Sequence, residues 1–146
     1  MRFKKVGLML VSTVLVLSSN TVFAKYSGVG GMTKHKIKSK VYKYHYDNGF
    51  TGIDALGWDS NLQYAWSRTG AALTCNIEID KQLILKKMTE KYGQFDFIHD
   101  VNGVGFHHLH SKKVKKFCTE ERVKEILEVI PKFEVGDFPE LFDVKK

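Results

Sequence analysis

The sequence predicts a single small α+β domain, in which a layer of strand and β-hairpin packs against two or three helices. The chain of 146 residues has the length of one domain. An Asn-Gly pair at 102–103 lies between alternating apolar residues, and two later segments carry clear helix signals. The alternative fold is a mostly helical bundle, in which residues 60–76 and 95–110 are both helices.

Composition supports a folded domain of ordinary type. Hydrophobic residues make up 43% of the chain and charged residues 27%, values typical of globular proteins and not of disordered ones. The formal net charge is +7. The length argues against a multi-domain protein, and the presence of only 2 Pro and no low-complexity tract argues against collagen-like and linker-like chains.

Residues 1–24 have the three-part plan of a secretory signal peptide. Three cations precede an apolar stretch at 6–18, and small side chains stand one and three positions before Lys25. The apolar stretch is shorter than the roughly 20 residues that a membrane-spanning helix needs. We therefore expect cleavage, export to the periplasm or the cell exterior, and no transmembrane segment in the mature chain.

Residues 25–43 form a basic arm that precedes the globular domain expected at 44–146. The arm contains six Lys and no acidic residue, so we expect it to contact anionic surfaces. Residues 36–46 are rich in Tyr and β-branched side chains with partial alternation, which predicts a lysine-guarded edge strand. Nucleic acid is not an expected partner, because no known binding motif accompanies the basic residues.

Helix signals recur in the second half of the chain. Ser60 or Asn61 is expected to cap a helix, and residues 71–79 fit either a helix or a strand. Asp80 and Gly93 are suited to the two ends of a further helix. A last helix is expected from Thr119 to about residue 130, with Leu127 in its apolar stripe and Pro131 ending it.

The hairpin predicted at 95–110 places three histidines on one face, His99, His108 and His110. Three imidazoles suit Zn²⁺ or Cu²⁺, so a metal site is one hypothesis. The other interpretation is that the phenylalanines of the same face define a surface that packs on the core. His107 lies on the opposite face near Asp100, and the two residues are the candidates for a catalytic base and its orienting acid in a small hydrolase.

Cys75 and Cys118 are the only cysteines. In an oxidising compartment an isolated pair is expected to form a disulfide, and closing this loop would stabilise the fold by up to about 4 kcal/mol on the chain-entropy model. A catalytic or metal-binding thiol is the alternative, and no C-x-x-C motif supports it.

Tyr42, Tyr44 and Tyr46 share one face of the predicted strand, beside Lys38 and Lys40. Such a row of aromatic and basic side chains is a candidate partner-binding surface, although rows of this kind also build cores. The leading functional hypothesis is an exported, non-enzymatic binding or inhibitor-type protein for an envelope, toxin or host macromolecule. A His-cluster metal-binding protein and a small hydrolase are the alternatives.

Overall fold

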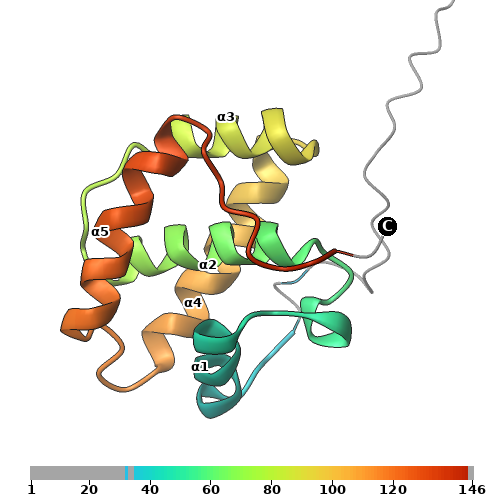
Figure 1. Ribbon diagram of the computed structural model, residues 1–146. Coiled ribbons are helices and arrows are strands. Elements are labelled where there is room, and N and C mark those ends of the chain that lie inside the picture. The colour runs from blue at the N-terminus through green and yellow to red at the C-terminus, as the bar shows by residue number, and fades with distance from the viewer. Residues whose placement is uncertain (1–31, 33–34, 145–146) are drawn as a thin grey trace, which may run out of the picture.

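The computed structural model describes residue 32 and residues 35–144, so the expected signal peptide and residues 25–31 and 33–34 of the basic arm lie outside the described part. Throughout that part the regular structure is helical (Figure 1). The five α-helices are α1 Ser39–Asn48, α2 Ser60–Thr74, α3 Lys81–Tyr92, α4 Phe106–Lys113 and α5 Glu120–Glu134. A 3₁₀ turn, η2 Gly52–Ala55, and a π-helical segment, η3 Ile98–Gly105, complete the set. The expected α+β fold with a hairpin layer is wrong, and the helical-bundle alternative fits.

Helix α2 lies at the centre of the bundle, and the other helices are arranged around it (Figure 1). Its cap is Asp59 and not Ser60 or Asn61 as expected, because the Asp59 carboxylate accepts hydrogen bonds from the amides of Asn61 and Leu62 at 2.7 and 3.3 Å. Most of its side chains are buried, including the polar ones of Gln63 and Arg68. The central helix therefore carries both the core and the buried polar groups described below.

The segment expected as an edge strand forms α1. Tyr42 and Tyr46 are four residues apart and both are buried, whereas Tyr44 lies on the opposite face and is 61% exposed. No side chain caps the start of α1, and no acidic residue occupies its first turn. The helix is therefore stabilised by the packing of its two buried tyrosines, a tertiary effect that overrides the local strand pattern.

The segment expected as a hairpin forms η3 and α4. The glycines of this region permit close contact between helices and do not form a turn. The indole of Trp66 lies where a side chain on Gly103 would project, and a Cβ on Gly70 of α2 would lie 2.8 Å from the backbone nitrogen of His108. The Trp66 indole also donates a hydrogen bond to His99 at 3.0 Å. Tight packing on α2 offsets the helix-propensity cost of glycine, about 1 kcal/mol per residue.

Helices α3 and α5 begin where the capping residues indicated. Asp80 accepts a hydrogen bond from the amide of Leu83 at 3.1 Å, and Gly93 follows the end of α3. The Thr119 hydroxyl accepts one from the amide of Arg122 at 3.3 Å.

The end of α5 differs from the expectation. Pro131 lies inside the helix, which continues to Glu134 because Phe133 extends the buried face of Ile126 and Ile130. Leu127 was expected in that face but is 55% exposed. At residues 71–79, where helix and strand were both open, α2 ends at Thr74 and no regular structure follows before α3.

The expected disulfide is confirmed. Cys75 and Cys118 are bonded, with their Cα atoms 5.6 Å apart and 43 positions apart in the sequence. The bond joins the end of α2 to the residue just before the cap of α5, so it closes the loop that contains α3, η3 and α4. None of the helices in the described residues is long and apolar enough to cross a membrane.

Candidate binding pocket

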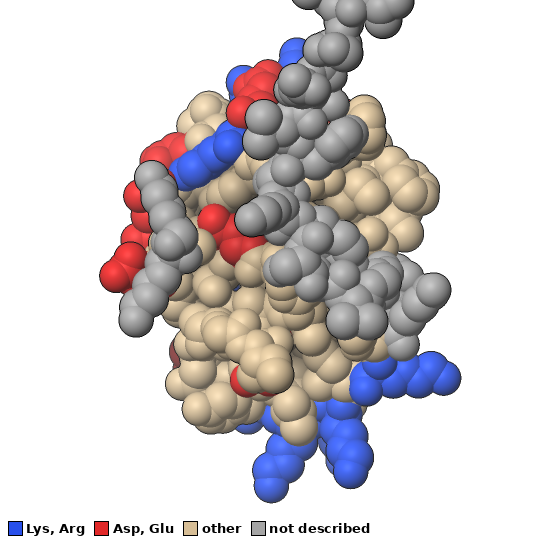
Figure 2. All heavy atoms as spheres, turned by 90° about the vertical axis from the view of Figure 1, so that its right-hand side faces the viewer, with Lys and Arg blue, Asp and Glu red and all other residues tan. Residues whose placement is uncertain are grey.

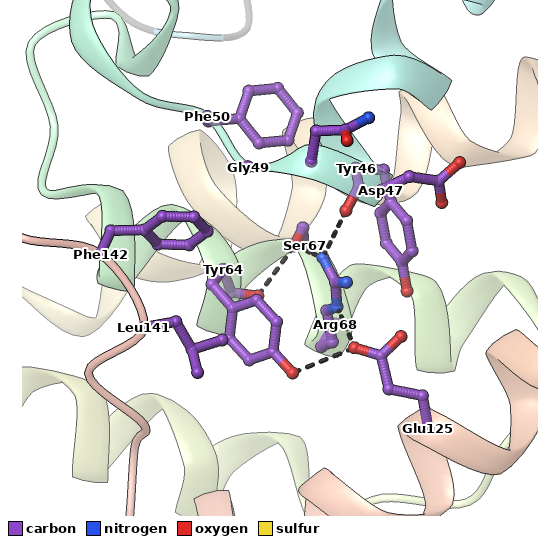
Figure 3. Close-up of a pocket in the computed structure, with 11 residues that line it drawn as sticks. Tyr46, Asp47, Gly49, Phe50, Tyr64, Ser67, Arg68, Glu125, Leu141 and Phe142 are labelled. Atoms are coloured by element: carbon purple, nitrogen blue, oxygen red, sulfur yellow. Dashed lines mark hydrogen bonds and ion pairs between the residues drawn. The ribbon is translucent and has the colours of Figure 1, made fainter.

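A pocket of about 410 Å³ opens between the end of α1, the middle of α2 and α5, and the C-terminal segment forms its remaining wall (Figure 3). Its walls combine aromatic rings with charged groups. The lining residues are Tyr46, Asp47, Asn48, Gly49, Phe50, Tyr64, Ser67, Arg68, Glu125, Leu141 and Phe142.

Arg68 is the central polar group of this pocket, and only 7% of its surface is exposed. Its Nε donates to Glu125 Oε1 at 2.8 Å, and its Nη1 donates to the Tyr46 carbonyl oxygen at 2.8 Å and to Ser67 Oγ at 3.2 Å. The guanidinium carbon lies 4.0 Å from the ring centre of Tyr46 and 4.3 Å from that of Tyr64. The cation is therefore held between two aromatic rings, in a cation–π arrangement.

The Nη2 nitrogen of Arg68 has no hydrogen-bond partner among the described residues. It is also not among the described atoms that are both buried and unpaired. Because a guanidinium carries five N–H donors in a fixed plane, a ligand in the pocket can be recognised through the two donors on Nη2 without moving the side chain.

Glu125 supplies the opposite charge beside Arg68. Its Oε1 accepts from both Arg68 and the hydroxyl of Tyr64, the latter at 3.0 Å, whereas its Oε2 has no partner in the part of the chain that the structure describes. Burial, together with the Glu125 carboxylate, raises the pKa of Tyr64 to about 12. Burial alone would lower the pKa of Arg68, but Tyr46 and Glu125 more than offset this effect, so the guanidinium remains charged.

A second ion pair joins Asp47 of the pocket lining to Arg122. Arg122 Nη2 donates to both carboxylate oxygens of Asp47 at 2.9 and 3.0 Å, and Arg122 Nη1 donates to the carbonyl oxygen of Phe117 at 3.0 Å. Each of the two cations at the pocket thus faces one carboxylate. The pocket as a whole is close to electrically neutral.

The C-terminal wall is fixed by Asn61 at the start of α2. Its Oδ1 accepts hydrogen bonds from the amides of Leu141 and Phe142 at 2.8 and 2.9 Å, and its Nδ2 donates to the Phe142 carbonyl at 3.0 Å. The Phe142 ring covers Gly49, where a Cβ would lie 2.5 Å from the ring. One buried amide side chain therefore holds the C-terminal segment beside the pocket.

The tyrosine and lysine candidates take different places in the structure. Tyr46 forms a pocket wall, Tyr42 is in the core, and Tyr44 is exposed on α1. Lys38 and Lys40 are exposed at the start of α1, as the sequence indicated. The three tyrosines thus do not form one face, because a helix separates positions that a strand would align.

The three histidines proposed as metal ligands are not brought together. His99 accepts from the Trp66 indole and donates to the Gly93 carbonyl at 2.7 Å. His110 accepts from the Ile37 amide at 3.2 Å and donates to the Phe106 carbonyl at 2.9 Å, and His108 contacts Thr74 at 2.9 Å. Among the described residues no group of three His, Cys, Asp or Glu side chains could hold a metal ion. The hairpin that would have aligned the three rings does not form.

The proposed base and acid of a hydrolase are also placed apart. His107 is fully buried, where its Nε2 donates to Gln63 at 2.7 Å and its Nδ1 accepts from the Tyr42 hydroxyl at 3.0 Å. Burial, with smaller contributions from His110 and Arg68, lowers the pKa of His107 well below its ordinary value. Asp100 instead binds Lys81 at 3.2 Å. His107 is thus a neutral structural group whose two nitrogens are both occupied.

Sequence reasoning missed Arg68 and Glu125, the two charged groups at the centre of the pocket. They lie 57 positions apart, so no local pattern joins them. The available signal was the (i, i+4) spacing of Tyr64 and Arg68 on a predicted helix, which places the two side chains on one face.

Comparison with known proteins gives no relative. No protein-family model matches the chain, and neither the curated proteins nor the solved structures contain a match. The functional argument therefore depends on the geometry of the chain itself.

Proposed function

We propose that this is an exported, non-enzymatic binding protein that captures a peptide segment of a partner protein in the Arg68 pocket. The observation that carries the proposal is the state of Arg68. This side chain is more than nine-tenths buried and is held by two rings, one carboxylate and one carbonyl, yet none of the described residues accepts a hydrogen bond from Nη2.

The free groups at the pocket match a peptide unit. Arg68 Nη2 is a donor for a backbone carbonyl, and Glu125 Oε2 is an acceptor for a backbone amide. Because Glu125 already balances the charge of Arg68, a neutral polar ligand suits the site better than a metal cation or a simple anion. The rings of Tyr46, Tyr64 and Phe142 offer apolar contact for one side chain of the ligand.

The chemistry of the lining favours binding over catalysis. Neither histidine nor cysteine is among the residues that line the pocket, all of which belong to the described part. Ser67 is buried, and its hydroxyl donates to the Tyr64 carbonyl at 2.8 Å while it accepts from Arg68. A nucleophile needs an adjacent base, and Ser67 is instead held by two structural hydrogen bonds.

Export is part of the proposal. The leader-like residues 1–24 support it, and so does the Cys75–Cys118 disulfide, since such bonds persist in oxidising compartments. The partner would then be a protein of the periplasm or the cell exterior, such as an envelope enzyme or a toxin that this protein inhibits.

The test uses peptides selected from a phage-displayed random library against the wild-type protein. Leu141 belongs to the pocket wall and is 57% exposed, so Leu141→Trp places a larger side chain there and narrows the pocket. Leu127→Trp adds the same side chain on α5 outside the pocket lining, at a position 55% exposed. We expect selected peptides to bind wild type and Leu127→Trp equally and to lose at least about tenfold in affinity, equivalent to 1.4 kcal/mol, for Leu141→Trp. Failure to select any peptide, or equal binding to both variants, would contradict the proposal.

A further inference from the structure

Two lysine clusters that are far apart in the sequence meet at one end of the bundle. The first precedes and begins α1, and the second ends α4 and continues into the loop after it. All eight side chains are exposed: Lys36, Lys38, Lys40, Lys43, Lys112, Lys113, Lys115 and Lys116. We call this group the lysine end.

Direct contacts hold the two clusters together. The Ser39 hydroxyl donates to the carbonyl oxygen of Lys113 at 3.1 Å, and the amide of Ile37 donates to His110 at 3.2 Å. Lys43, Lys115 and Lys116 line one surface hollow of about 460 Å³. Figure 2 shows Lys and Arg side chains gathered at the lower end of the face it presents, at the height that α1 occupies in Figure 1.

The charge of the lysine end is largely uncompensated. No ion pair within the described residues involves any of its eight lysines. The hollow also contains carboxylates, but Asp47 binds Arg122 and Glu125 binds Arg68, which leaves Glu121. Acidic residues are instead concentrated later in the chain, where residues 119–143 contain eight acids against three cations. The molecule therefore has a basic end and an acid-rich C-terminal part.

We propose that the lysine end binds the anionic phospholipid surface of a membrane, with the rest of the bundle facing away. None of the eight lysines lines the Arg68 pocket, although the hollow beside them shares Asp47 and Glu125 with it, and the proposal does not depend on the function proposed for that pocket. Arg122 also lines the hollow but is paired with Asp47, so the cations left without an ion pair are lysines, flexible point charges that suit a diffuse negative surface, whereas fixed recognition of carboxylates favours arginine. Exposed Val41 and Leu109 stand among these lysines, and Leu109 shares a face of α4 with Lys112 and Lys113.

The sequence that precedes α1 carries further charge of the same sign. Residues 25–43 contain six Lys and no acid, so every charged side chain from Lys25 to the middle of α1 is positive. Each lysine near an anionic leaflet raises the membrane partition coefficient about fivefold, and the factors for neighbouring lysines multiply. An acidic protein is the competing partner, and it would need carboxylates placed to match these flexible side chains.

The experiment is co-sedimentation with vesicles of phosphatidylcholine alone and of phosphatidylcholine mixed with phosphatidylglycerol. The protein is purified from the cells that produce it, with its N-terminus as it is found there. One variant combines Lys38→Gln, Lys40→Gln and Lys113→Gln. The matched control combines Lys86→Gln, Lys124→Gln and Lys132→Gln, which removes three exposed charges from α3 and α5.

We expect binding to the mixed vesicles only, with a partition coefficient that falls as salt screens the charges. The first variant should lose at least about tenfold in partitioning, and the control should stay within about twofold of wild type. Equal losses in the two variants would overturn the proposal, because net charge and not the lysine end would then account for binding. Absence of vesicle binding at low salt would also overturn the proposal. If the protein then bound to a polyglutamate column, the lysine end would be assigned to an acidic protein partner.

Discussion

Replacing Gly70 by Ala tests how closely α2 and α4 pack, since two effects of opposite sign act at this position. Alanine favours a helix over glycine by about 1 kcal/mol, so the substitution would stabilise an isolated α2. In the folded protein the new Cβ lies 2.8 Å from the His108 nitrogen and 2.9 Å from both the Val104 oxygen and the His107 Cβ. Two of these three atoms belong to backbone, so no side-chain rotation removes the overlap.

The magnitude follows from the same distances. Ordinary contacts are about 3.5 Å, so the two helices must separate by roughly 0.6 Å along a buried interface. Overpacking of this kind costs typically 1–3 kcal/mol, and contacts with backbone favour the upper end of that range. Subtracting the gain in helix propensity leaves a net destabilisation of about 2 kcal/mol.

Denaturant unfolding followed by circular dichroism measures this difference. Lys86→Gly and Lys86→Ala, at an exposed position of α3, give the Gly-to-Ala effect without packing. We expect the Ala variant at position 86 to be the more stable of that pair and Gly70→Ala to be less stable than wild type. If Gly70→Ala is as stable as wild type or more so, the close contact between α2 and α4 is refuted.

Three further predictions concern stability and the chain end. Combining Cys75→Ser with Cys118→Ser should lower the free energy of unfolding by up to about 4 kcal/mol, because the reduced chain regains the entropy of a 43-residue loop; an unchanged denaturation midpoint would contradict this. Burial keeps the pKa of His107 well below its ordinary value, so the unfolded chain binds a proton that the native protein does not. Stability should therefore be highest above about pH 6.5 and fall as the pH decreases, by up to about 1.4 kcal/mol per unit for this group, and His107→Gln should reduce that slope in denaturation curves measured across this range. Asn61→Ala removes three hydrogen bonds to the C-terminal segment, worth about 1 kcal/mol each, and should increase amide hydrogen exchange at Leu141 and Phe142 while α2 stays protected.

Local capping chemistry was predicted well for α3 and α5, although the cap of α2 is Asp59 and not Ser60 or Asn61. Asp80, Gly93 and Thr119 mark the ends of α3 and α5 because each acts on amides or carbonyls within a few residues of itself. The disulfide was also predictable, since Cys75 and Cys118 have no other possible partner within the chain.

The errors arose where residues act on distant elements. Gly103 was interpreted as a turn glycine, but its lack of a side chain admits the Trp66 indole from another helix. Tyr42 and Tyr46 suited a strand by composition, whereas their burial against the bundle determines a helix. Neither interaction has a local signature.

The candidate site was predictable only in part. Tyr46 was identified as a partner-binding candidate and does line the pocket, but Arg68 and Glu125 are joined only by the packing of α2 against α5. In the same way the lysines of the basic arm were visible in the sequence, whereas their meeting with the lysines at the end of α4 required the fold.

The most direct test of the binding account observes Arg68 itself. A proton–nitrogen correlation spectrum of the arginine side chains would be recorded while a peptide selected against the wild-type protein is titrated. The account predicts that the Arg68 Nε and Nη2 signals shift in step with peptide binding and that Leu141→Trp removes both the shift and the binding. A peptide that binds tightly while the Arg68 signals stay unchanged would place the partner elsewhere on the protein and contradict the account.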